Sequence, residues 1–213
     1  QVAQRTGGNP LFAIQLVGDW VARGVLIVGE RGFRLRPGER GEIPDDIHEL
    51  WLRRISQLFA HSDEANAAWL CLELAATLGQ DFLPREWHVA CAEENMLVPH
   101  TLVDVMLSHR LLEQRDACLT FVHGMLRESL DRSARETGRH ARHHGACARM
   151  LQRVYPVANA SIAERRAAHC IEASQLDEAL EPLLQAGIAR TRLGDFRAAL
   201  ALLGQRNTAM MAL

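Results

Sequence analysis

Apolar residues recur every three to four positions along most of the chain, which is the spacing of helices that bury one face. The clearest amphipathic helix is predicted over residues 43–58, where Asp45 and Asp46 suit the first turn because they complement the helix dipole. The helix predicted over residues 62–78 is apolar on nearly every side in its later part, AAWLCLELAATL, and should be central and buried. Further helices are predicted over residues 10–23, 84–92, 99–110, 123–134, 138–153, 161–173, 177–193 and 196–203.

Two pairs of short β-like runs interrupt the helical pattern. Val25–Val28 and Gly32–Leu35 form the first pair, and Leu111–Arg115 and Cys118–Phe121 form the second. Each pair is separated by polar or glycine-rich residues and therefore predicts a β-hairpin. The second hairpin follows three predicted helices and precedes another helix that opens at His123. This order of elements predicts a winged-helix module.

The last two predicted helices repeat a pattern of small and large apolar residues, as tetratricopeptide (TPR) arrays do to let helices stack closely. Leu176, Ala179, Leu180 and Leu183 correspond to Phe196, Ala199, Leu200 and Leu203. The second set follows the first by 20 residues, whereas a TPR repeats every 34 residues or so. The sequence thus predicts a mainly α protein, in which a winged-helix module with small β-hairpins is followed by a TPR-like helical array.

Composition excludes several functions. The 24 basic residues are balanced by 26 acidic ones, so no global field attracts nucleic acid or a membrane surface. All basic residues are arginine, and without lysine the chain has neither a GxxxxGK[ST] phosphate loop nor Schiff-base chemistry. Because we also find no nucleophile elbow and no convincing carboxylate pair, we expect no enzyme activity. Five scattered cysteines indicate reduced thiols in the cytoplasm, and no apolar run reaches the roughly 18 residues of a membrane span.

Two constellations were weighed as ligand sites. A DNA-reading helix needs arginines or amides near its start, but the helix predicted over residues 99–110 offers His100 and Asp104 there, so DNA binding is not expected. His140, His144 and Cys147 share one helix face at a spacing that can bind zinc. The sequence offers no obvious fourth ligand and places arginines nearby, so a solvated basic face without metal is predicted instead.

Two further motifs are weak signals singly, but their order along the chain makes them informative. The turn GGNP at residues 7–10 comes first, and FVHGMLRESL at residues 121–130 follows the predicted winged helix. Together with IPDDIHELWLRRISQL, LELAATLGQDF and LDEALEPLLQAGIARTRLGDFRAALALL, they make the chain resemble the signal-transduction ATPases with numerous domains (STAND). The bacterial branch of that family includes LuxR-type transcription regulators, multidomain serine/threonine kinases and cyclases.

The resemblance implies three regions. Residues 1–42 correspond to the C-terminal part of an ATPase module, with a lid helix and a hairpin. Residues 43–135 correspond to a linker helix and the winged-helix domain, and residues 136–213 correspond to the start of the helical-repeat sensor. The chain begins without Met and stops within a helical array, so we expect a fragment of a longer protein whose ATPase core lies upstream.

The resemblance also implies roles for particular residues. Gly8, Asn9 and Pro10 match the family turn that lies against adenine, and His123 matches the histidine that reaches the β-phosphate of ADP. ATP or ADP with Mg²⁺ would be held by the upstream core, so the fragment itself has no cofactor. Its expected partners are that core and a protein or small-molecule inducer at the helical repeats. A DNA-binding module or a protein–protein scaffold remains the alternative function.

Overall fold

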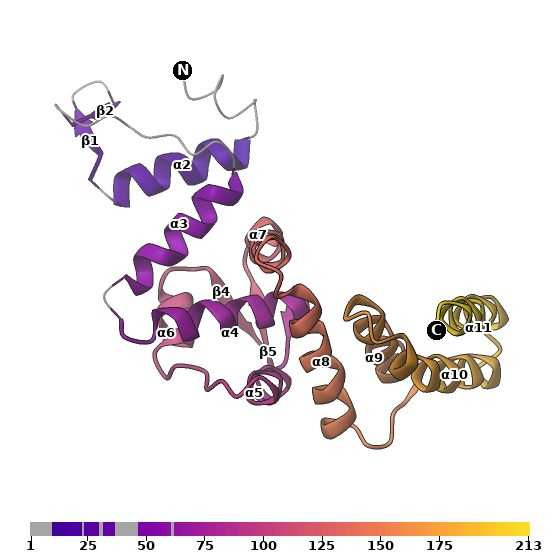
Figure 1. Ribbon diagram of the computed structural model, residues 1–213. Helices are drawn as coiled ribbons and strands as arrows, with labels where there is room; N and C mark the ends of the chain where they lie inside the picture. The colour runs from indigo at the N-terminus through magenta and orange to yellow at the C-terminus, as the bar shows by residue number, and fades with distance from the viewer. Residues whose placement is uncertain (1–9, 23, 30–31, 37–46, 61) are drawn as a thin grey trace. The chain divides into compact units, whose positions relative to one another are not determined.

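The computed structural model describes residues 10–22, 24–29, 32–36, 47–60 and 62–213 (Figure 1). The chain is mainly helical, which confirms the predicted class. It divides into two compact units, Gln1–His61 and Ser62–Leu213, which are described separately below. The division into regions 1–42, 43–135 and 136–213 stays a prediction. Within the described ranges, no helix has the length and apolarity needed to cross a membrane.

The first unit joins two helices and a hairpin through one apolar cluster. Its elements are α2 (Pro10–Ala22), β1 (Leu26–Gly29), β2 (Gly32–Leu35) and α3 (Ile47–Phe59). β1 and β2 pair antiparallel, as the sequence pattern predicted. Leu16 and Trp20 of α2 pack with Val25 and with Leu50 of α3, because these are the apolar positions that face one another. Pro10 opens α2, where its missing amide hydrogen costs no helix hydrogen bond.

The second unit begins with helices grouped around a small sheet. Its elements are α4 (Ala65–Leu78), β3 (Asp81–Phe82), α5 (Pro84–Glu93), α6 (Leu102–Ser108), β4 (Leu112–Arg115), β5 (Cys118–Phe121) and α7 (Gly124–Glu136). The sheet is antiparallel with the order β3-β5-β4. Cys71, Leu72, Leu74 and Ala75 are fully buried, which confirms that α4 is a central helix. The sequence pattern did not predict β3, which is only two residues long.

The unit continues with four helices that follow one another as hairpins (Figure 1). They are α8 (His140–Val154), α9 (Ala160–Glu172), α10 (Leu176–Arg192) and α11 (Phe196–Met211). A cluster of mostly small residues joins α8, α9 and α10, since short side chains let helix axes approach closely. This cluster contains Ala148, Ala167, Cys170, Ala179 and Leu183.

The turns before α10 and α11 have the same geometry. Ser174 and Gly194 both have positive φ, at 59° and 78°. The residue after each donates its amide to a carbonyl five positions earlier, from Gln175 to Cys170 at 2.9 Å and from Asp195 to Arg190 at 3.0 Å. The similarity that the sequence predicted between these helices therefore extends to the backbone of their turns.

Candidate functional site

His123 lies between the end of β5 and the start of α7. Hydrogen bonds to Gln80 and to Leu111 fix this junction. The amide of Phe121 donates to Gln80 O at 3.0 Å, and the Gln80 side-chain amide donates to Phe121 O. The amide of Val122 donates to Leu111 O at 3.1 Å. His123 itself is extended, with φ −123° and ψ 121°, and occupies the N-cap position of α7. These hydrogen bonds therefore fix the direction in which the chain leaves β5 and enters α7.

The surroundings of His123 favour a negatively charged ligand. Its side chain is half-buried and makes no capping hydrogen bond to α7, and the first turn of this helix carries no acid. Arg127 follows four residues later, so it lies on the same side of the helix. A helix N-terminus carries a partial positive charge and outward-pointing amides. Imidazole, amides and guanidinium at one end of α7 form a set of donors suited to phosphate.

The other predicted nucleotide-binding residues belong to the first unit. Pro10 is the exposed first residue of α2. Gly8 and Asn9 lie outside the described residues. A joint site formed by this turn and His123 therefore stays a prediction.

A buried acid connects α7 to its neighbours. Glu73 on α4 is fully buried and accepts hydrogen bonds from Trp69 at 2.8 Å and from Ser133 of α7 at 2.9 Å. Arg139 donates to both carboxylate oxygens at 2.8 Å, and His143 of α8 lies at 3.2 Å. Burial alone would raise the pKa of Glu73, but these donors, Arg139 first, lower it to about 2. Glu73 is therefore ionised and joins α4, α7 and α8.

A second buried acid connects the sheet-containing region to α9. Glu86 on α5 accepts a hydrogen bond from the Tyr155 hydroxyl at 2.7 Å. Arg165 on α9 donates to its two carboxylate oxygens at 3.1 and 2.6 Å. Burial opposes ionisation, but the hydrogen bonds from Arg165 and Tyr155 lower the pKa of Glu86. The helices that follow α7 are thus held by two fully engaged carboxylates as well as by apolar packing.

Sequence reasoning missed both acids as organising residues. Glu73 had one signal, because it is the single charge within the apolar run AAWLCLELAATL. A charge at a buried position needs a partner, but the partners Ser133 and Arg139 lie 60 and 66 residues away. Spacing along the chain does not identify such distant partners.

The prediction of a solvated basic face on α8 is wrong. His140, His143 and Cys147 are buried because α8 packs against α4, α5 and α9. The neighbouring arginines do not stand as unbalanced charges. Arg142 pairs with Glu94, and Arg149 contacts Glu93 at 3.3 Å. The arginines that argued against a cation site are thus neutralised by acids of α5 and of the residue that follows it.

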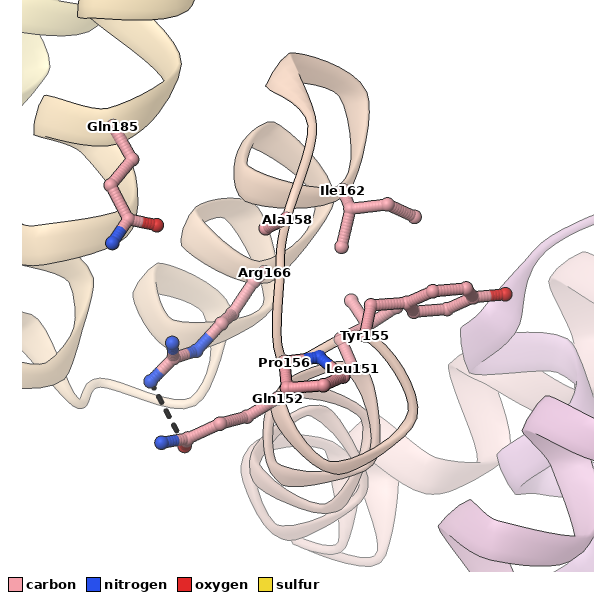
Figure 2. A pocket seen from close by; sticks show the side chains of 8 residues that line it. All are labelled: Leu151, Gln152, Tyr155, Pro156, Ala158, Ile162, Arg166 and Gln185. Atoms are coloured by element: carbon pink, nitrogen blue, oxygen red, sulfur yellow. Dashed lines mark hydrogen bonds between the residues drawn. The ribbon is translucent and has the colours of Figure 1, made fainter.

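A pocket of about 280 Å³ lies between the end of α8, the linker after it, α9 and α10. Figure 2 shows Arg166 and Gln152 pointing toward one another in it, and the Arg166 guanidinium donates to Gln152 Oε1 at 3.0 Å. Arg166 Nε is buried and has no hydrogen-bond partner among the described residues. The Tyr155 hydroxyl points away from the pocket toward Glu86. A buried donor without a partner among the described residues therefore borders this pocket.

Comparisons with protein-family models, with curated proteins and with solved structures gave no match to this chain.

Proposed function

We propose that this chain is the regulatory arm of a STAND-type signal-transduction ATPase. In this proposal, α4 to α7 with the three-stranded sheet form a winged-helix module, and α8 to α11 form a TPR-like array. The arm couples the nucleotide state of an upstream ATPase core to an inducing signal, and it catalyses no reaction itself. The observation that carries the proposal is the position of His123 at an acid-free helix N-terminus.

The chemistry of this position suits the β-phosphate of ADP. A neutral imidazole can donate one ring N–H to a phosphate oxygen, and nearby phosphate favours the charged imidazolium, which donates more strongly. Arg127 lies one helical turn further on. The core would supply the phosphate loop and Mg²⁺, and Gly8, Asn9 and Pro10 would approach the adenine. His123 therefore acts as a latch that closes only when ADP is present.

The buried carboxylates support coupling between the latch and the array. Glu73 ties α7 to α4 and α8, and Glu86 ties α5 to α9. A displacement of α8 must carry α4 along or break the Glu73–Arg139 pair, and a displacement of α9 must carry α5 along or break the Glu86–Arg165 pair. Breaking such a pair costs about 3–5 kcal/mol. Because Glu73 also accepts a hydrogen bond from Ser133 of α7, a displacement of the array by an inducer is passed on to the helix that follows His123.

The array offers two features to an inducer. The pocket beside Arg166 could accept a small polar molecule. On α11 and the turn before it, Leu193, Phe196 and Leu200 are exposed, and an apolar face of this kind lets a further helix or a protein partner stack. We infer a cytoplasmic protein whose effector domain is a kinase, a cyclase or a DNA-binding domain.

Limited proteolysis of the parent protein, which contains the ATPase core, tests this function. With ADP bound, we expect the segment between the two units to be protected, and with a non-hydrolysable ATP analogue we expect it to be cut several-fold faster. Equal cleavage with both nucleotides would contradict nucleotide-dependent closure.

The alternative, a DNA-binding module, has weak support. The α6 helix, which is in the recognition-helix position, carries exposed Asp104 in its first turn, where a phosphate backbone would lie. It also buries Leu102 and Met106. A mobility shift of duplex DNA by the chain, weakening steeply with salt and lost with Arg110→Ala, would favour DNA binding over the proposed function.

A further inference from the structure

A group of histidines and acids gathers where α7, α8 and α9 meet. Gly138, with φ +73°, ends α7 in the left-handed conformation that favours glycine, and Arg139 N donates back to Ala134 O at 2.8 Å. Because this turn is short, α8 starts beside the last turns of α7. His140 and His144, one helical turn apart on α8, therefore lie next to Asp131 of α7.

The side chains in this group lie close together without hydrogen-bonding to one another. One potential ligand atom from each of Asp131, His140 and His144 lies within 4.8 Å of the others. His140 Nε2 is 3.7 Å from Asp131 Oδ1 and 3.8 Å from Glu172 Oε2 of α9. These separations are too long for hydrogen bonds. They are close to the roughly 3.3 Å between neighbouring ligands of a tetrahedral ion with bonds of about 2.0 Å.

His140 supplies an independent sign of a ligand. Its ring is about nine-tenths buried, and Nε2 has no hydrogen-bond partner among the described residues. A buried ring nitrogen without a partner costs free energy, and native structures normally satisfy it. The unsatisfied nitrogen points toward the two carboxylates, which are the groups that a cation would bridge.

Burial and neighbouring positive groups disfavour the charged form of both imidazoles. Burial, and then the charge of Arg135, lowers the pKa of His140. Burial, and then the neighbouring His169, lowers the pKa of His144 to about 3.

Neighbouring side chains orient these ligands. His144 Nδ1 and His169 Nδ1 of α9 are 3.0 Å apart, so one ring donates to the other. When His144 Nδ1 is the donor in this hydrogen bond, the Nε2 of His144 carries the lone pair that can bind an ion. Arg135 donates to Asp131 Oδ2 at 3.1 Å, which leaves Oδ1 toward His140. Such outer partners fix ring and carboxylate orientation in metal sites.

We propose that Asp131, His140 and His144 bind a zinc ion, with Glu172 or a water molecule as the fourth ligand. Two imidazoles and one or two carboxylates are a donor set that Zn²⁺ accepts in tetrahedral geometry. A cavity of about 540 Å³, lined in part by His140 and Glu172, gives the ion access from solvent. This site is independent of the nucleotide latch.

A zinc ion at this site would link helices from different parts of the second unit. Asp131 belongs to α7, the helix that His123 opens, whereas His140 and His144 belong to α8, and Glu172 belongs to α9. Zinc would hold these three helices together in addition to the buried Glu73 contacts that join α4, α7 and α8. The ion therefore stiffens the junction between the sheet-containing region and the helical array.

Equilibrium dialysis of the 213-residue chain against Zn²⁺, followed by elemental analysis, tests the site. We expect one zinc per chain and a melting temperature that rises with zinc concentration. Asp131→Asn and His144→Gln should abolish both effects. His169→Phe removes only the orienting hydrogen bond and should weaken the affinity about ten- to a hundredfold.

Two controls distinguish this site from adventitious binding. His100 is an exposed histidine elsewhere in the chain, and Cys118 is a half-buried thiol. His100→Ala and Cys118→Ser should leave stoichiometry and affinity unchanged. Circular dichroism checks that each variant is folded; Asp131 is partly exposed, so Asp131→Asn is the variant least prone to misfold. Absence of stoichiometric zinc in the folded chain, or equal binding by folded Asp131→Asn, would overturn the proposal.

Discussion

At the scale of single residues, Glu73 is the buried charge that joins three helices of the second unit. It is fully buried, and every donor around it comes from its own helix or from α7, α8 and the turn between them. Glu73→Gln removes the charge and leaves Arg139 without its carboxylate. We expect a loss of about 3–5 kcal/mol in the free energy of unfolding, measured in urea. Glu128→Gln on the exposed side of α7 is the matched control and should change stability by less than about 0.5 kcal/mol.

Glu73 also predicts acid sensitivity. Its folded pKa of about 2 lies below the ordinary value of 4.5, so the unfolded chain binds the proton more readily. The stability it contributes is present above pH 4.5 and is lost as pH falls toward 2. An unfolding midpoint for Glu73→Gln that falls as steeply as that of the wild type in this range would show that another group is responsible.

The buried histidines act at higher pH than Glu73. Burial comes first among the causes that lower the pKa values of His144 and His169 from 6.5 to about 3 and 4. Because the folded state keeps them neutral, stability is full above pH 6.5 and declines as pH falls below it. In the absence of zinc, the urea midpoint should therefore drop between pH 7.5 and 5. The drop should be smaller in His144→Gln, and an identical drop would contradict this assignment.

At the scale of elements, the helical hairpin α10–α11 depends on one close approach. A Cβ added at Gly187 of α10 would lie 3.1 Å from Leu203 Cδ2 of α11, whereas a Cβ at Gly204 meets nothing within 4 Å. Gly187→Val should therefore destabilise the hairpin by about 1–3 kcal/mol through overpacking. Gly204→Ala should stabilise it by about 0.5–1 kcal/mol, because alanine is the better helix former. Thermal melting with both variants checks the pair, and loss of stability in Gly204→Ala would contradict it.

Several elements could be predicted from the sequence because their signals are local. The period of apolar residues located the helices, and the two hairpins were located by short β-like runs beside turn residues. The pattern did not predict β3, since two residues are too few to show a period. The helix over 99–110 is shorter in the structure, where α6 ends at Ser108 and Arg110 takes a positive φ of 53°.

The main error of the sequence-based prediction concerns α8, which was expected to present a solvated face but is buried on that face. Its arginines and histidines predicted a solvent-exposed polar face, but α8 packs against α4, α5 and α9. Arg139 is bonded to Glu73 of α4, and His144 to His169 of α9. A polar residue that is satisfied by a partner 25 or 66 residues away leaves no trace in a local pattern. The candidate zinc ligand Asp131 was missed because it belongs to α7, and the spacing within α8 does not show which residue of another helix lies beside His140 and His144.

At the scale of the whole molecule, the proposed function makes His123 a latch between the chain and ADP and not a core residue. The side chain is half-buried and does not cap α7. His123→Ala should therefore change the stability of the isolated chain by less than about 1 kcal/mol, in contrast to Glu73→Gln. In the parent protein, the same change should remove a charge-assisted contact to phosphate of about 2 kcal/mol. That energy shifts the balance between closed and open forms roughly thirtyfold.

The rate at which ADP leaves the parent protein is the most direct test of the latch. We expect His123→Ala to release ADP about ten- to thirtyfold faster than the wild type, and His100→Ala, which removes an exposed histidine elsewhere, to release it at the wild-type rate. Unchanged ADP release by His123→Ala, together with a large drop in its melting temperature, would contradict the account and make His123 a structural residue.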